Sequence, residues 1–242
     1  MNDLRKTFDY TEGHKGTITV AKTFLSGVFM WMFLALGITA ATAYLFASTP
    51  GLITLLYNPE TGGMSIFGWI IMLAPLGLVI WMSAGFQRMS ASIMVLIFVL
   101  YSILMGASLS FIFIAYTDAS IAKTFLITSA MFGTMAVLGY TTKTDLSKFG
   151  SIMFMGLIGL IIASVVNMFM RSDTMDYIIS FIGVLIFTGL TAYDVQKLKR
   201  IGEGVTSETE SARKLTIMGA LTLYLDFINL FLFLLRFFGN RK

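Results

Sequence analysis

The sequence predicts an all-α integral membrane protein, a bundle of seven transmembrane helices. Of its 242 residues, 57% are hydrophobic and only 12% are charged, whereas soluble domains carry about 25% charged residues. A helix needs about 20 predominantly apolar residues to cross a bilayer, and the chain contains seven apolar segments of about that length. Because these segments are continuous rather than alternating between apolar and polar residues, they exclude a transmembrane β-barrel.

The predicted spans form a single membrane domain, residues 24–242, after a polar N-terminal tail, residues 1–23. Turn-forming residues separate the first two spans at Asn58-Pro59-Glu60-Thr61-Gly62-Gly63, and polar residues separate the fourth from the fifth at Thr141–Lys148. The segment Lys197–Leu215 is predicted to be a solvated loop before the last span. The seven spans are Phe24–Ala47, Ser65–Phe86, Ser92–Ala115, Ile121–Tyr140, Phe149–Met170, Thr174–Gln196 and Thr216–Phe238.

The distribution of Lys and Arg favours a cytoplasmic N-terminus. With that orientation, twelve basic residues lie in the inner segments and five in the outer ones, as the positive-inside rule requires. The basic C-terminus would then lie outside unless the last helix crosses only partly, so its side stays open. Basic residues of the Lys197–Lys214 segment are expected to meet anionic lipid headgroups. The short loops and compact chain suggest a bacterial inner membrane.

The composition excludes several kinds of chemistry. The chain has no cysteine and one histidine, His14, in the polar tail, so zinc, haem and histidine-based nucleophilic catalysis are poorly supported. Any ion handled here would be coordinated by oxygen, which suits protons, calcium, magnesium or sodium. The formal charge of +4 is spread over membrane-flanking loops, which gives no support for nucleic-acid binding. We therefore predict no enzyme activity and no cofactor.

Two carboxylates, Asp194 and Asp226, lie inside long apolar segments. A charged side chain at the bilayer centre costs about 2.5–3.5 kcal/mol on insertion scales, so such a residue is expected to titrate, to pair or to bind a cation. Asp226 is about ten residues into the predicted seventh span, and Asp194 is predicted near the cytoplasmic end of the sixth. The basic residue Arg88, at the end of the second span, falls on the same side of the membrane.

These three residues suggest a proton-controlled gate. Two carboxylates that share a site cannot both ionise cheaply, so the pair should share a proton, whereas a nearby guanidinium favours the ionised forms. Protonation would weaken a link between the pair and Arg88 and let helices shift. Deprotonation would create an oxygen-rich site for a divalent cation, and Asp194 and Asp226 are the candidate calcium ligands.

The chain resembles the Bax inhibitor-1 family, the transmembrane Bax inhibitor motif proteins, and most specifically its bacterial members. The segments that carry the resemblance are Leu223–Phe231 with Leu235–Gly239, Tyr193–Lys197 and Thr142–Ser147, and the spacing from Arg88 to Gly106 also suits the family. The resemblance covers all seven predicted spans and leaves the polar tail outside.

The resemblance implies a seven-helix bundle with the C-terminal helix at its centre. It also implies a pH-sensitive calcium leak channel whose two hydrogen-bonded aspartates act as the pH sensor. The resemblance assigns the sensor role to Asp194 and Asp226, and it assigns to Arg88 the role of an arginine that latches the sensor. The expected partners are calcium ions, protons and the lipid bilayer. No protein partner is identified.

Two other functions share features with this sequence. A membrane regulatory or binding protein, which modulates a membrane protease or a stress or cell-death factor without transport, stays open. An intramembrane aspartyl protease also uses a Tyr-Asp pair and a second aspartate, and Tyr193-Asp194 is similar to that. However, Asp226 follows Leu223-Tyr224-Leu225 rather than a Gly-x-Gly pattern, and no Pro-Ala-Leu segment lies downstream.

Overall fold

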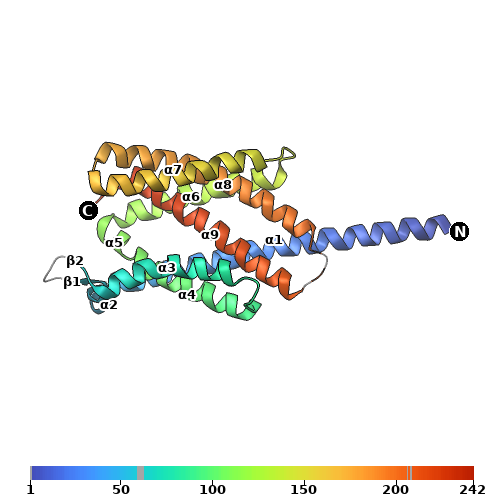
Figure 1. The fold of residues 1–242 in the computed structure, drawn as a ribbon, viewed down its shortest axis with the longest axis horizontal. Coiled ribbons are helices and arrows are strands. Elements are labelled where there is room, and N and C mark those ends of the chain that lie inside the picture. Colours follow the sequence, from blue (N-terminus) through green and yellow to red (C-terminus); the bar gives the residue numbers. More distant parts are fainter. Residues whose placement is uncertain (1, 59–62, 206, 208) are drawn as a thin grey trace.

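The chain is almost entirely helical. The computed structural model describes residues 2–58, 63–205, 207 and 209–242, and the elements are shown in Figure 1. Two short strands pair as an antiparallel hairpin, the only sheet within those ranges. The elements are α1 (Asn2–Ser48), α2 (Pro50–Leu56), β1 (Tyr57–Asn58), β2 (Gly63–Met64), α3 (Ile66–Gly85), α4 (Ala91–Leu109), α5 (Phe111–Ala115), α6 (Asp118–Thr141), α7 (Ser147–Met170), α8 (Asp173–Glu203) and α9 (Glu210–Phe238).

The predicted set of seven membrane spans is confirmed in number and order. Within the described residues, seven helical segments are long and apolar enough to cross a bilayer. The first of them, Thr23–Ser48, is the C-terminal part of α1, whose backbone continues helically from the predicted tail. The spans are Thr23–Ser48, Ile66–Gly85, Ala91–Ala115, Asp118–Thr141, Ser147–Met170, Asp173–Glu203 and Glu210–Phe238.

The prediction that Lys197–Leu215 is a loop is wrong for most of that segment. Helix α8 continues to Glu203, and α9 already begins at Glu210. Polar contacts stabilise these extensions: Lys199 Nζ donates to the carbonyl of Tyr140 at 3.0 Å, and the hydroxyl of Thr209 caps α9 by accepting from the amide of Ala212 at 3.2 Å. Thr206 and Glu208 lie outside the described residues.

Two further details differ from the predicted spans. The third span is interrupted at Ser110, which separates α4 from α5 and whose hydroxyl donates to the carbonyl of Ala107 at 2.7 Å. The connection between the first two spans contains α2, which begins at Pro50, and the β1–β2 pair. The predicted turn residues 59–62 lie outside the described part of the chain.

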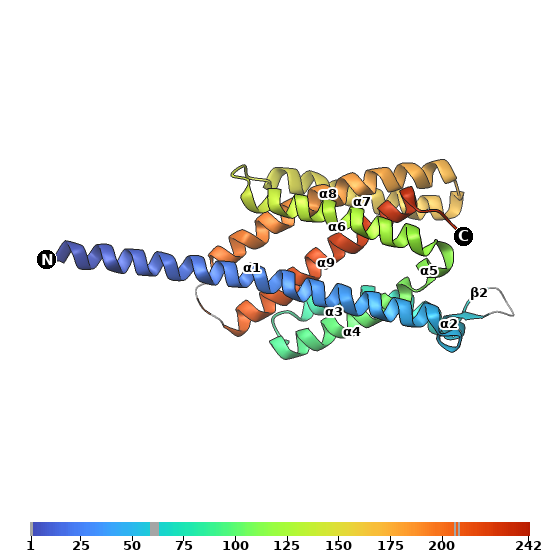
Figure 2. The same ribbon diagram turned by 180° about the vertical axis from the view of Figure 1, so that it is seen from behind.

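Helix α9 is the centre of the bundle, as predicted. It packs against α8, α1, α6 and α4, and 67% of its most apolar stretch is buried, compared with 11% for α7. Figure 1 shows α9 running obliquely between α6–α8 on one side and α3–α4 on the other, and Figure 2, the view from behind, shows α1 crossing in front of it. The peripheral helices α3 and α7 pack on α4 and α8 respectively, and they flank a cavity described below.

The two ends of the chain lie at opposite ends of the bundle (Figure 1). Because α9 runs through the whole bundle, the C-terminal residues meet the segment before α6. The amide of Thr117 donates to the carbonyl of Asn240 at 3.1 Å, and the amide of Lys242 donates to the carbonyl of Ala115 at 3.0 Å. At 29 residues, α9 is long enough to cross a bilayer completely, and the side on which the C-terminus lies stays open. The cytoplasmic placement of the N-terminus stays a prediction.

Candidate ion and proton site

The structure brings Asp194 and Asp226 together. Asp194 lies on α8 and Asp226 on α9, two helices that pack along each other, and their side chains interact directly. The residues are only 9% and 5% exposed. Asp194 lies nine residues before the end of α8, roughly 14 Å at 1.5 Å per residue, because that helix continues past the predicted end of the sixth span.

The rotation of α8 that aims Asp194 at α9 is fixed by glycines on its neighbours. A Cβ added to Gly139 of α6 would lie 2.2 Å from the carbonyl oxygen of Ala192, and one added to Gly150 of α7 would lie 2.4 Å from the ring of Tyr193. No side chain fits at either point. The backbone of α8 therefore lies directly against α6, and the Tyr193 ring lies against α7, which leaves the next residue, Asp194, facing α9.

The rotation of α9 is fixed by Tyr224. Its ring is buried, and its hydroxyl makes a 2.8 Å hydrogen bond with the hydroxyl of Thr39 on α1. Thr39 also donates to the carbonyl of Ser102 on α4 at 2.9 Å. Residues two apart are about 200° apart around a helix. Since Tyr224 faces α1 and α4, Asp226 is directed to the opposite side, toward α8.

The carboxyl pair lines a cavity of about 1150 Å³ between α3 and α7, with α8 and α9 as its floor. Its wall is largely aliphatic and aromatic, and it includes Tyr101 of α4. Oδ2 of Asp226 and the hydroxyl of Tyr101 are both buried, and neither has a hydrogen-bond partner among the described residues. Because buried polar groups are normally satisfied, these two atoms indicate a site for something that the cavity takes up.

Lys197 is the basic side chain whose charge acts on Asp194. It lies three residues further along α8 and therefore on the same face, it lines the cavity, and it is exposed. Sequence reasoning missed both Lys197 and Tyr101. The spacing from Asp194 was a signal for Lys197, whereas nothing in the sequence places Tyr101 in the wall of the cavity that Asp226 also lines.

Arg88 is not brought to the carboxyl pair. It lies in the exposed turn between α3 and α4, forms no ion pair with any described residue and does not line the cavity. The turn is anchored instead by Lys214 of α9, whose Nζ donates to the carbonyls of Phe86 at 2.9 Å and Met89 at 3.2 Å. The predicted latch is therefore not formed in this conformation and stays a prediction.

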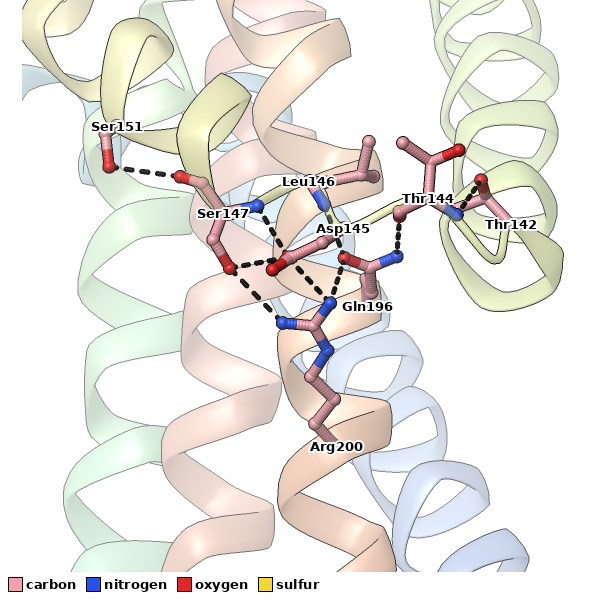
Figure 3. Close-up of polar contacts among 8 residues, drawn as sticks. All are labelled: Thr142, Thr144, Asp145, Leu146, Ser147, Ser151, Gln196 and Arg200. Carbon is pink, nitrogen blue, oxygen red and sulfur yellow. Dashed lines mark hydrogen bonds and ion pairs between the residues drawn. The ribbon is translucent and has the colours of Figure 1, made fainter.

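Two of the segments that carry the family resemblance meet beside the pair. Gln196, two residues after Asp194, is buried, and its side chain binds the backbone of the α6–α7 loop. Its Nε2 donates to the carbonyl of Thr144 at 2.8 Å, and its Oε1 accepts from the amide of Leu146 at 2.9 Å (Figure 3). The loop is thereby fixed to the part of α8 that carries Asp194.

Arg200, one turn further along α8, binds the same loop. Its Nη2 lies 2.7 Å from Oδ1 of Asp145, and its Nη1 donates to the hydroxyl of Ser147 at 3.2 Å (Figure 3). The same carboxylate oxygen accepts from the amide of Ser147 at 3.0 Å and from its hydroxyl at 2.7 Å. The hydrogen bonds from Ser147, together with Arg200, lower the pKa of Asp145 to about 2.

The Asp145 contact should make this loop sensitive to acid. A carboxylate with a pKa below its unfolded value of about 3.9 stabilises the fold above that value, and the stabilisation is lost as the pH falls toward the folded pKa. We expect Asp145→Asn to unfold at a lower temperature than the wild type at pH 7. The two midpoints should converge as the pH falls from about 4 to about 2, and thermal unfolding in detergent measures this. A gap of constant size at all pH values would contradict this account.

The carboxyl pair does not by itself make a resident metal site. Among the described residues, no group of three or more His, Cys, Asp or Glu side chains is close enough to hold a metal ion. Calcium takes six to eight oxygen ligands, so two carboxylates must be supplemented by hydroxyl, carbonyl or water oxygens. Such a site suits an ion in transit better than one held permanently.

This architecture is that of a multi-pass membrane protein built around a buried carboxyl pair. The family model described as inhibitor of apoptosis-promoting Bax1 matches residues 21–242. The chain thus belongs to the Bax inhibitor-1 family, and the predicted resemblance is confirmed. The match begins at residue 21, close to the end of the polar tail.

Bacterial relatives match over most of their length. The inner membrane protein YbhL of Escherichia coli is 50% identical over 222 residues, which cover 91% of this chain and 93% of that protein. An uncharacterized protein of Rickettsia prowazekii is 43% identical over 242 residues, the whole of both chains, and one of Borreliella burgdorferi is 43% identical over 228 residues, 94% of this chain and 96% of that protein. These descriptions name no reaction, so the absence of enzyme activity stays a prediction.

Proposed function

We propose that this protein is a calcium leak channel of a bacterial inner membrane whose opening is controlled by a proton shared between Asp194 and Asp226. The observation that carries the proposal is the direct interaction of two carboxyl groups from different helices, both more than nine-tenths buried. The membrane assignment follows the seven apolar spans and the inner membrane location in the description of the Escherichia coli relative.

The proton is needed because of the surroundings of Asp226. With both carboxyl groups ionised, two like charges would lie in contact at low dielectric, and Oδ2 of Asp226 has no donor among the described residues. A single proton between them removes the repulsion. When that proton leaves, the negative charge must be balanced, either by separation of the helices or by a cation that enters the cavity.

The carboxyl pair lies where its charge can control an ion path through the bundle. Asp226 lies roughly 24 Å from the first residue of α9 and roughly 18 Å from the last, at 1.5 Å per residue, so it is near the middle of the central helix. The floor of the cavity is the α8–α9 contact itself. A change in the separation of these two helices would change the cavity directly.

The test is calcium flux into liposomes that contain a calcium-sensitive dye and the purified full-length protein. We expect flux well above that of empty liposomes, with a rate that changes severalfold between pH 8 and pH 6. Magnesium at the same concentration, read with its own dye, measures selectivity. Flux no greater than that of empty liposomes at every pH would overturn the channel and favour the regulatory membrane protein that binds a partner without transport.

A further inference from the structure

The cavity is too large and too apolar to serve a metal ion alone. Its volume of about 1150 Å³ is slightly above the range for sites of organic ligands, about 300–1,000 Å³. A hydrated ion gains nothing from a wall of Leu, Met and Phe side chains, whereas an organic ligand buries its apolar surface there. The size and lining of the cavity thus indicate a hydrophobic ligand.

The polar atoms of the cavity specify the charge of that occupant. Asp226 and Tyr101 are 5% and 0% exposed and are among the residues that line the cavity, and each has a buried oxygen without a hydrogen-bond partner among the described residues. Lys197, the basic residue at the cavity, acts on Asp194 and is itself exposed. With one proton shared between them, Asp194 and Asp226 still carry one negative charge inside the protein, and a buried charge favours a partner of opposite sign, here a cation in the cavity.

Aromatic side chains in the cavity wall fit the same occupant. Tyr101, Phe187 and Phe233 line the cavity from α4, α8 and α9, and the faces of such rings attract organic cations within about 6 Å. Quaternary ammonium and similar groups are bound in this way in aromatic sites. Aromatic walls, an unbalanced acid and a drug-sized volume together describe a site for a lipophilic organic cation.

Such a ligand can reach the site from the bilayer. The cavity is bordered by side chains of α3 and α7 that are largely exposed, among them Leu76 at 63%, Phe154 at 59% and Met155 at 62%, and these faces meet lipid in a membrane. Hydrophobic cations partition into bilayers, so they would be concentrated at this opening.

We propose that the cavity between α3 and α7 binds lipophilic organic monocations, with Asp226 as the counter-ion and Tyr101 as part of the aromatic wall. The proposal concerns the site of the proposed channel, but it does not require ion transport. In a channel that passes calcium through this site, a bound monocation would act as a blocker.

The test uses two probes of similar size and opposite charge, tetraphenylphosphonium and tetraphenylborate, in equilibrium dialysis with the purified full-length protein in detergent. Detergent without protein corrects for partition into micelles. We expect saturable binding of one tetraphenylphosphonium ion per chain and no saturable binding of tetraphenylborate. Equal binding of the two probes would overturn the proposal, because it would show that both bind by hydrophobic partition alone.

Three variants locate the site. Asp226→Asn should weaken tetraphenylphosphonium binding at least tenfold, and Leu157→Trp, which fills the cavity from α7, should weaken it without removing a charge. Asp145→Asn removes a carboxylate outside the cavity and should bind as the wild type does. Size-exclusion chromatography confirms that each variant is folded. Wild-type affinity in both cavity variants would contradict the proposal, whereas lost calcium flux with intact binding would contradict only the channel.

Discussion

In calcium-dye liposomes, Asp226→Asn is expected to carry a calcium flux that no longer changes between pH 8 and pH 6. The amide has nearly the shape of the protonated acid, stays neutral at every pH, and can donate a hydrogen bond from its NH2 group to the carboxylate of Asp194. The flux should therefore be fixed near the level that the wild type reaches at its low-pH limit. Asp194→Asn should behave in the same way, because either amide removes the shared proton.

The matched control is Asp145→Asn. Asp145 is an exposed carboxylate in the α6–α7 loop, paired with Arg200 at 2.7 Å, and it does not line the cavity. We expect this variant to keep the pH dependence of the wild type. If Asp226→Asn and Asp194→Asn also retained the wild-type pH profile, the sensor would have to lie elsewhere in the protein, and the role proposed for the pair would be abandoned.

The number and order of the spans could be predicted because lipid imposes a length and a composition on each of them. The ends of α8 and α9 could not. Hydropathy marks where a helix leaves lipid, whereas a helix ends where its backbone groups find other partners. Thr209 caps α9 well before the apolar residues begin, and Lys199 is bound by the carbonyl of Tyr140, so both helices continue into polar sequence.

The carboxyl pair could be predicted for an energetic reason, since two aspartates in apolar segments are too costly to be left without a role. The position of a residue along its helix can be read from the sequence, but the direction in which its side chain points around the bundle cannot. The sequence predicts that Arg88 ends the second span on the same side of the membrane as Asp194. The structure leaves it in an exposed turn away from the pair. Tyr101 was missed because its place in the cavity wall depends on how α4 packs against α9.

The close contact between α6 and α8 should depend on the absence of a side chain at Gly139. In Gly139→Ala the new Cβ would lie 2.2 Å from the carbonyl oxygen of Ala192 and 2.9 Å from its Cα and carbonyl carbon. Backbone atoms cannot rotate away as a side chain can, so the two helices must separate. Overpacking of this kind typically costs about 1–3 kcal/mol. Thermal unfolding of the purified protein in detergent should show a clearly lower midpoint.

Gly133→Ala on the same helix is the control. A Cβ added there meets nothing within 4 Å, and alanine favours a helix over glycine by up to about 1 kcal/mol, so its midpoint should equal or exceed that of the wild type. Because Ala192 precedes Asp194 by two residues, separating α6 from α8 in Gly139→Ala also changes how α8 presents its carboxylate to α9. An unchanged midpoint together with an unchanged pH response of the flux would show that this contact does not position the pair.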